Sequence, residues 1–373
     1  MKKRMSRLAA LSLGVAMLLT ACSGGQGSAT PTPAPVSEPP QQSEAPTPSQ
    51  APAGKIGEGR TLVVGVWGAE QETLVREHVV KPFEEETGAK VELILGGTGD
   101  RYSKLYAEVD NPSMDVVYLN MAQTEQATRD GVILPADPEG VANYNNLYDI
   151  AKCGDGYGVA LMATGLMYNT DLMDTAPTSW ADVLSDDYKG LVCPYTMPSS
   201  QGNAFLVMLA TALGDSKNVD AALEALAAAK PFPLITEGIP ERNQAFLDNE
   251  VAIGPQINGY VYSAKNEGIP VEFVYPEEGA ALSMNCAVIP KNSANADLAK
   301  IFINYHLAQA CQEAYAEVLY YGPTNSAVTL PDELASAVVY GEDDVAKLVA
   351  LDNEWVSANE ASWTEKWNTM ILD

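Results

Sequence analysis

Apolar positions along the chain follow two alternating patterns. Three short runs rich in Val, Ile and Leu predict buried β-strands: residues 61–68, 90–97 and 114–120. Three stretches with apolar residues three or four positions apart follow them and predict amphipathic helices: residues 72–88, 99–109 and 121–131. This alternating order predicts right-handed crossovers and a parallel sheet, whose carboxyl edge is the usual place for a ligand crevice.

A second α/β unit is predicted from residue 157 onward. Residues 157–173 contain two strand-like apolar segments around Ala163-Thr164-Gly165. Later strands are expected within residues 190–196, 250–257, 270–276 and 284–290, and helices within 199–214, 218–230, 258–268 and 296–318. The closing residues 343–370 are expected to be helical, with Trp355, Trp363 and Trp367 as packing residues. The predicted fold class is therefore α/β with two lobes.

The N-terminus predicts export from the cytoplasm. Four basic residues precede the apolar stretch 8–19, which is too short for a comfortable membrane span and is typical of a signal peptide. The stretch ends in Leu-Thr-Ala-Cys, which resembles a bacterial lipobox, so residues 1–21 are the predicted signal peptide. Cys22 is the predicted lipidated residue and the first residue of the mature protein.

Residues 22–54 are expected to form a tether. They are rich in Pro, Ser and Thr and contain no aromatic residue, so they offer little from which to build a core. We expect a disordered stalk, rich in polyproline II, that holds a monomeric folded body outside the cell membrane or in the periplasm.

Charge and cysteine content narrow the possible partners. The formal net charge of −27 predicts repulsion from nucleic acid, and no cofactor is expected. Cys153, Cys193, Cys286 and Cys311 are compatible with disulfides or with buried free thiols, and no pair has CxxC spacing.

Candidate binding residues fall at the ends of the predicted strands and at helix starts. Aromatic and glycine-rich ends occur at Trp67, at Gly97 and Thr98, and at Tyr118. The sequence Ser199-Ser200-Gln201 begins a helix, where free backbone N–H groups suit an anionic or polar ligand. The simpler interpretation of the Ser199-Ser200-Gln201 segment is an ordinary N-cap. The simpler interpretation of the turn at Gly97 and Thr98 is a tight turn that needs glycine.

An enzyme is not expected. Ser199 or Ser200 as a nucleophile would need a nearby base, and the chain has two histidines and none of the common hydrolase motifs. A secreted glycosidase remains the enzymatic alternative, because paired carboxylates are possible among 49 acidic residues.

Several segments in order resemble those of ABC-transporter substrate-binding proteins, in particular the spermidine/putrescine-binding branch of the type II periplasmic-binding-protein fold. The clearest are Thr-Ser-Trp-Ala-Asp-Val-Leu at 178–184, Glu-Gly-Ile-Pro-Val-Glu-Phe-Val-Tyr-Pro at 267–276 and Tyr-Tyr-Gly-Pro-Thr-Asn at 320–325. The resemblance covers most of residues 60–373.

The resemblance implies two lobes joined by crossing strands, with a ligand cleft between the lobes and closure about a hinge. The first lobe would contain residues 55–160 and about 286–330, and the second residues 161–285, with C-terminal helices in 331–373. The partners would be a small solute, the permease and ATPase subunits of an importer, and the membrane through Cys22. A sensory binding protein that feeds a receptor is an alternative.

The resemblance also suggests site residues. Trp67 and Tyr321 match aromatic positions of the family cleft. Asn258 and Tyr260 are further candidates in a segment where Ile257 replaces an aromatic residue of the family and Tyr260 stands where some iron binders have tyrosines. Asn285 stands where polyamine binders have an aspartate. The Pro-Ser-Ser-Gln-Gly start at 198–202 is similar to that of binders for phosphonates, thiamine and sugar phosphates.

The sequence therefore leaves two classes of solute: a polyamine-like amine, or a molecule that bears a phosphonate, phosphate or carboxylate. Ferric iron is a further alternative because of Tyr260, although no metal ligand set is predicted.

Overall fold

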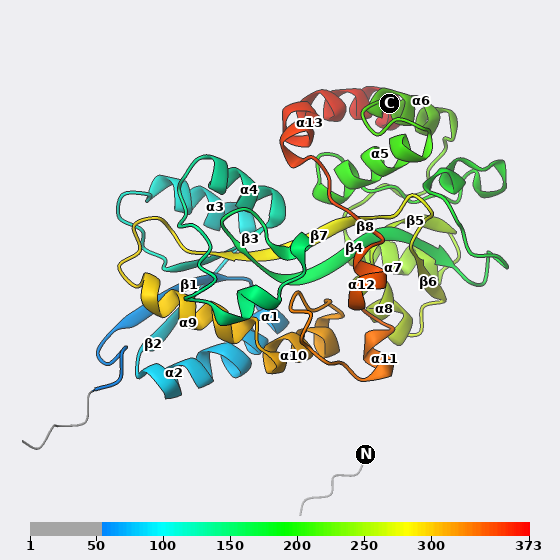
Figure 1. Ribbon diagram of the computed structural model, residues 1–373. Helices are drawn as coiled ribbons and strands as arrows, with labels where there is room; N and C mark the ends of the chain where they lie inside the picture. Colours follow the sequence, from blue (N-terminus) through cyan, green and yellow to red (C-terminus); the bar gives the residue numbers. More distant parts are fainter. Residues whose placement is uncertain (1–53) are drawn as a thin grey trace, which may run out of the picture. The chain divides into compact units, whose positions relative to one another are not determined.

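The computed structural model describes residues 54–373, drawn in colour in Figure 1. The predicted signal peptide, the predicted lipidation at Cys22 and all but the last residue of the predicted tether lie outside the described residues. Within the described part, no helix is both long enough and apolar enough to cross a membrane.

The predicted parallel unit is present at the start of the folded chain. Strand β1 (Thr61–Val66) pairs in parallel with β2 (Lys90–Leu95) and with β3 (Val116–Asn120). The predicted first helix is built from α1 (Ala69–Val75), a π-helical turn η1 (Arg76–Val80) and α2 (Lys81–Thr87). It ends at Gly88, whose φ of 73° is the left-handed conformation that glycine adopts without strain. Helices α3 (Thr98–Ala107) and α4 (Met121–Arg129) follow β2 and β3.

Two long strands continue the sheet into the second lobe. The order is β2-β1-β3-β7-β4-β5, with β4 (Tyr157–Asn169) and β7 (Ala280–Val288) antiparallel at its centre. Strand β5 (Ile253–Ile257) and strand β6 (Val271–Val274) both pair with the second half of β4. Figure 1 shows β4 and β7 running from one group of helices to the other.

Three details differ from the sequence expectations. Residues 157–169 form one continuous strand, because β7 pairs with its first half while β5 and β6 pair with its second half. Residues 190–196 form no strand and make one bridge, between Val192 and Ile253; Pro194 has no N–H group to extend the ladder. The closing segment contains a two-residue strand, β8 (Leu348–Val349), which pairs with β7.

The remaining helices cover the two lobes. Their bounds are α5 (Ser200–Ala212), α6 (Val219–Ala228), α7 (Ile239–Leu247), α8 (Asn258–Asn266), α9 (Ala296–His306), α10 (Gln309–Leu319), α11 (Asp332–Ala335), α12 (Gly341–Val345) and α13 (Asn353–Trp367). Short 3-10 turns lie at Ala142–Asn146, Asp149–Ala151, Trp180–Leu184 and Asp186–Tyr188, and a π-helical turn at Asn368–Leu372.

Separate hydrophobic cores support the lobes. In the first lobe, Phe83 of α2 and Phe302 of α9 pack edge to face in the same core as the buried residues of β1. In the second lobe, Trp180 and Phe205 pack together with α6 and α13. Trp363 and Trp367 are buried in this second core and Trp355 packs against it, as expected from their apolar pattern. Helix α13 therefore belongs by packing to the second lobe, although it comes last in the chain.

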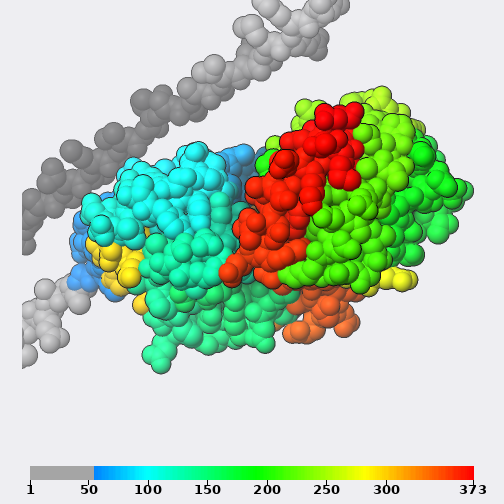
Figure 2. All heavy atoms as spheres, turned by 90° about the horizontal axis from the view of Figure 1, so that it is seen from above, coloured from blue at the N-terminus to red at the C-terminus, as the bar shows by residue number. Residues whose placement is uncertain are grey.

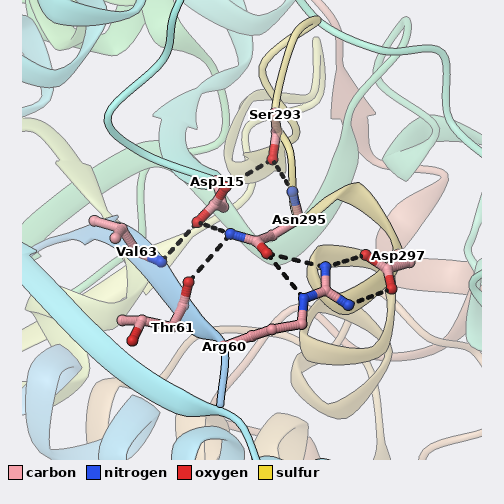
Figure 3. Close-up of polar contacts among 7 residues, drawn as sticks. All are labelled: Arg60, Thr61, Val63, Asp115, Ser293, Asn295 and Asp297. Carbon is pink, nitrogen blue, oxygen red and sulfur yellow. Dashed lines mark hydrogen bonds and ion pairs between the residues drawn. The ribbon is translucent and has the colours of Figure 1, made fainter. Parts of the chain in front are cut away.

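A polar network joins the start of β1 to the start of α9 (Figure 3). The buried Asp115 carboxylate accepts hydrogen bonds from the Val63 N–H, the Ser293 hydroxyl and the Asn295 amide. Arg60 donates to Asn295 and, through both terminal nitrogens, to Asp297 at 2.7 Å. The Arg60 hydrogen bond holds the pKa of Asp297 below its usual value. None of these residues lines the cavity between the lobes, so the network stabilises a part of the first lobe that lies outside this cavity.

Candidate solute-binding site

A cavity of about 510 Å³ lies where the two lobes face each other. Both lobes and the central strands contribute to its wall. The lining residues are Trp67, Gln71, Thr98, Asn120, Met121, Ala122, Gln123, Met162, Ser200, Gln201, Asn203, Ala204, Ile257, Tyr260, Leu282, Ser283, Met284, Asn285, Tyr321, Leu351, Asn353, Val356, Ser357 and Glu360. A cavity of this size fits a small molecule.

Trp67 forms the wall of the first lobe. It directly follows β1, and its indole N–H donates a 2.9 Å hydrogen bond to the Thr98 hydroxyl at the start of α3. The Arg101 guanidinium lies over the indole, 4.6 Å from the ring centroid, in a cation–π contact. One face of Trp67 is therefore already occupied by a cation of the protein itself.

Arg101 is buried and has no carboxylate among its hydrogen-bond partners in the described chain. It is 2 % exposed, and it donates to the carbonyls of Tyr118 and Val66 at 2.9 and 3.2 Å, to the Gly96 carbonyl, and to the Thr98 hydroxyl at 3.4 Å. Burial lowers the pKa of Arg101 to about 10. The group therefore stays a cation at neutral pH and ties together the carboxyl ends of β1, β2 and β3.

The start of α4 forms the next part of the wall. Asn120 caps this helix, since its side chain accepts a 2.8 Å hydrogen bond from the Gln123 N–H while the Gln123 side chain accepts from the Asn120 N–H. Met121 and Ala122 complete this surface. The capping box fixes the backbone at the end of β3 and so sets the position of the cavity wall.

The Ser199-Ser200-Gln201 segment opens α5 on the second lobe. Ser199 is the N-cap: its hydroxyl accepts from the Gly202 N–H at 3.0 Å and donates to the Thr196 carbonyl at 2.7 Å. Ser200 and Gln201 line the cavity. Gly202 is required here, because an added Cβ would lie 2.7 Å from both the Thr196 carbonyl and the Met197 sulfur.

Glu360 is the one charged side chain among the described residues that line the cavity. It projects from α13, and one carboxylate oxygen accepts a 2.6 Å hydrogen bond from the Asn203 amide nitrogen on α5. Asn203 is 6 % exposed, and its carbonyl oxygen has no hydrogen-bond partner in the described chain. Because the carboxylate can only accept, it fixes which end of the Asn203 amide faces it, and the free oxygen remains an acceptor.

Aromatic and apolar side chains form the rest of the wall. Tyr260 at the start of α8 and Tyr321 after α10 lie next to each other, and burial raises the pKa of Tyr321 with the Tyr260 hydroxyl as a further cause. Strand β7 contributes Ser283, Met284 and Asn285. Amide, hydroxyl and carboxylate side chains line the cavity together with apolar ones, so the cavity suits a polar small molecule.

Seven of the eleven residues proposed from the sequence line this cavity: Trp67, Thr98, Ser200, Gln201, Tyr260, Asn285 and Tyr321. The structure does not bring the other four to the wall. Gly97 is the N-cap residue of α3, and the Ser199 hydroxyl is used in its own cap. Tyr118 is fully buried, with its hydroxyl 2.7 Å from the His306 ring nitrogen Nδ1. Asn258 is buried and accepts a hydrogen bond from the Ala163 N–H.

The sequence interpretation missed the contribution of α13. Asn353, Val356, Ser357 and Glu360 all line the cavity and are spaced at positions i, i+3, i+4 and i+7, so they share one face of the helix. A mostly polar stripe on a helix whose tryptophans are buried is the sequence signal that could have identified this face as part of the site. Asn120, Gln123 and Asn203 were also not predicted, because their sequence context is that of an ordinary helix start.

In the described chain, the cavity serines have no histidine beside them to act as a base, and the Glu360 carboxylate in the same wall is held by the Asn203 amide. Neither histidine lines the cavity, and His306 is fully buried, with its pKa lowered to about 3 by burial. Among residues 54–373, no group of three or more His, Cys, Asp or Glu side chains is placed to hold a metal ion. The four cysteines of this part of the chain are buried free thiols.

Known proteins agree with this architecture. A Salmonella typhimurium spermidine/putrescine-binding periplasmic protein is 27% identical over 266 residues, which are 67% of this chain and 74% of the relative. A second relative from that organism, provisionally named a 2-aminoethylphosphonate-binding periplasmic protein, is 23% identical over 75% of this chain and 86% of its own length. A Clostridium perfringens ABC transporter structure superposes with a TM-score of 0.74 at 27% identity, covering 83% of this chain and 99% of that one.

The family follows from a match to residues 78–340, which are well over half of the chain. The chain belongs to the bacterial extracellular solute-binding proteins. Its α/β fold is that of the periplasmic binding proteins. Members of this family are non-enzymatic solute-binding components of ABC transporters, so the chain is an extracellular or periplasmic binding protein and not an enzyme. Trp67 and Glu360 both lie outside the matched range.

Proposed function

We propose that this protein captures a small, amine-bearing polar solute between its two lobes and delivers it to the permease and ATPase of an ABC importer. The observation that carries the proposal is Glu360, a carboxylate at the cavity wall that the Asn203 amide holds in place. A carboxylate and an ammonium group form a charge-assisted hydrogen bond, which is stronger than one between neutral groups. The aromatic rings of Tyr260 and Tyr321 offer further surface to an alkylammonium chain.

A solute with an anionic group is the second candidate. The starts of α3, α4 and α5 all contribute residues to the cavity wall, namely Thr98, Met121 and Ser200. Helix N-termini carry partial positive charge and favour anions. Of the two relatives from Salmonella typhimurium, one is named for polyamines and the other for an aminophosphonate. Solutes with an amine and a solute with an anionic group therefore both occur among the names of related proteins.

Capture would proceed by closure about a hinge in β4 and β7. The proposed lobes consist of residues 55–160 with about 286–330, and of residues 161–285. A solute favours the closed form only through contacts that it makes better there than in an open form. Solute groups that reach from Trp67 to Glu360 satisfy this condition, because the two residues belong to different lobes.

We also propose that the mature protein is attached to the outer face of the cell membrane through a lipid on Cys22. The Leu-Thr-Ala-Cys sequence that ends the apolar stretch supports this. Replacing Cys22 by Ala should release the protein from the membrane fraction into the medium or periplasm. A Cys22→Ala variant that stays in the membrane fraction would contradict the anchor.

A thermal-shift screen tests the proposed solute class. The panel holds monoamines, diamines, polyamines, aminophosphonates, sugar phosphates and dicarboxylates. A solute at about 100 times its Kd stabilises the native state by about 2.7 kcal/mol, which raises the melting temperature by roughly 5 °C in a domain of this size. We expect shifts with solutes that contain an amine. Shifts confined to solutes without an amine would refute the proposal in favour of the anionic candidate.

A further inference from the structure

The charges around the cavity are arranged asymmetrically between the lobes. On the second lobe, the wall contains the Glu360 carboxylate, held by the amide nitrogen of Asn203, whose own carbonyl oxygen is buried without a partner in the described chain. The carboxylate is a negatively charged hydrogen-bond acceptor. A donor with a positive charge, such as an ammonium group, matches this part of the wall.

The first lobe has the opposite character. The Arg101 guanidinium lies directly behind Trp67 and has carbonyl and hydroxyl partners, with no carboxylate within hydrogen-bonding distance. Asp100 lies on the same helix but is exposed and does not line the cavity. The N-terminus of the ten-residue helix α3 adds partial positive charge at Thr98.

This arrangement disfavours a second ammonium group at Trp67. An indole face can stabilise a cation, but Arg101 already occupies one face at 4.6 Å from the ring centroid. A solute ammonium on the opposite face would lie close to a like charge across a thin, apolar ring. The repulsion between like charges is strong where little water separates them.

We propose, building on the amine-binding function above, that the natural solute is a zwitterion that spans the cavity. Its ammonium group binds Glu360 on the second lobe, and its anionic group, a carboxylate or a phosphonate, lies at Trp67 and Thr98 on the first lobe. Di- and polyamines are the wrong solutes because their second positive charge faces Arg101 and finds no second carboxylate at the described wall. Closure is then driven by a solute whose two ends have opposite charges.

Calorimetric titration of the full mature protein with matched solutes tests this. For each carbon-chain length, the set contains an ω-amino acid, an ω-aminoalkylphosphonate, an α,ω-diamine, a monoamine and a dicarboxylate. We expect the best zwitterion to bind about tenfold or more tighter than the diamine of the same length. The first two members separate a carboxylate from a phosphonate. A diamine that binds as tightly as the zwitterion overturns the inference but leaves the amine-binding function standing.

Binding only by solutes without an amine, or by no member of the set, overturns both the inference and the amine-binding function.

Glu360→Gln provides the matching variant on the second lobe. It keeps the shape and the contact with Asn203 but removes the charge, so zwitterion binding should weaken by about tenfold or more while dicarboxylate binding stays the same or improves. Glu365→Gln is the control, because Glu365 is exposed on the same helix and does not line the cavity. Unchanged zwitterion binding by Glu360→Gln refutes the assignment of the ammonium group.

Thr98→Asp tests the first lobe by a gain of binding. The new carboxylate stands at the first position of α3, where acidic residues stabilise a helix, and it can accept the Trp67 N–H as Thr98 does. Diamine binding should tighten and zwitterion binding should weaken, each relative to the uncharged Thr98→Asn control. If both variants have the same ratio of diamine to zwitterion affinity, the first lobe does not select the anionic end.

Discussion

The Asn353 amide on α13 donates a 2.9 Å hydrogen bond to the Glu125 carboxylate on α4, and this contact joins the second lobe to the first beside the cavity. In Figure 2, the red C-terminal segment lies along the green surface of the second lobe and meets the teal surface of the first. Because α13 also carries Glu360, one helix supplies both a cavity wall and a contact between the lobes.

Removing this contact should weaken solute binding, although Asn353 is uncharged and so forms no ion pair with a solute. A hydrogen bond to a charged group at a partly exposed position contributes about 1 kcal/mol, so Asn353→Ala should raise the solute Kd roughly fivefold. Calorimetric titration measures the change, with Ser362→Ala, an exposed substitution on the same helix, as the control. An unchanged Kd in Asn353→Ala would mean that the Asn353–Glu125 contact does not favour closure.

Trp67 should report solute binding by fluorescence. It is the one tryptophan among the described residues that lines the cavity, whereas Trp180, Trp363 and Trp367 are buried in the second core. Solute binding should change the emission of the wild-type protein, and Trp67→Phe should abolish the change. Trp355→Phe, a variant at a partly buried tryptophan outside the cavity, should keep it. A change that persists in Trp67→Phe would place the solute away from the first-lobe wall.

The network around Asp115 should matter for stability and not for binding. Three groups donate to this buried carboxylate, and Asp115→Ala leaves them without their acceptor (Figure 3). We expect a loss of about 2–3 kcal/mol in the free energy of unfolding, measured by urea denaturation. The solute Kd of the folded variant should equal that of the wild type. A large loss of affinity with little loss of stability would contradict a purely structural role.

His306 predicts an early decline of stability in mild acid. Burial lowers its pKa in the folded protein to about 3, below the value of about 6.5 expected in the unfolded chain. Below about pH 6.5 the unfolded chain therefore binds a proton that the folded protein does not, so stability falls as the pH falls. The slope can reach about 1.4 kcal/mol per pH unit.

His306→Gln should remove this slope, since glutamine is uncharged and can still form a hydrogen bond with Tyr118. Denaturant titrations at about pH 7 and about pH 5 compare the two proteins. A further loss below about pH 4 should remain in both, because the pKa of Asp297 is held low by the hydrogen bond from Arg60. Equal slopes above pH 5 in both proteins would exclude His306 as the cause.

Local patterns predicted most of the fold because they act over short distances. The runs at β1, β2 and β3 and the spacing in α3 and α4 identified the parallel unit correctly. The pairing of β4 with β7 joins residues more than a hundred positions apart, and the sequence pattern could not show that β4 is continuous. Residues 190–196 failed as a strand because one proline outweighed their apolar character.

The candidate site was harder to predict because a residue's direction depends on tertiary packing. Trp67 and Ser200 follow element boundaries that the sequence marks, and both line the cavity. Tyr118 also stands near a strand end, but alternation along the strand turns its ring into the core toward His306. Glu360 on α13 comes more than a hundred residues after the cavity residues of α5, so only the folded chain shows its contact with Asn203.

The most direct test is a crystal structure of the protein with the tightest-binding zwitterion from the titration series. We expect the solute in the cavity between Trp67 and Glu360, with its ammonium nitrogen at about 3 Å from the Glu360 carboxylate and its anionic group on the side of Thr98. A solute bound elsewhere, or bound with its anionic group toward Glu360, would contradict this expectation.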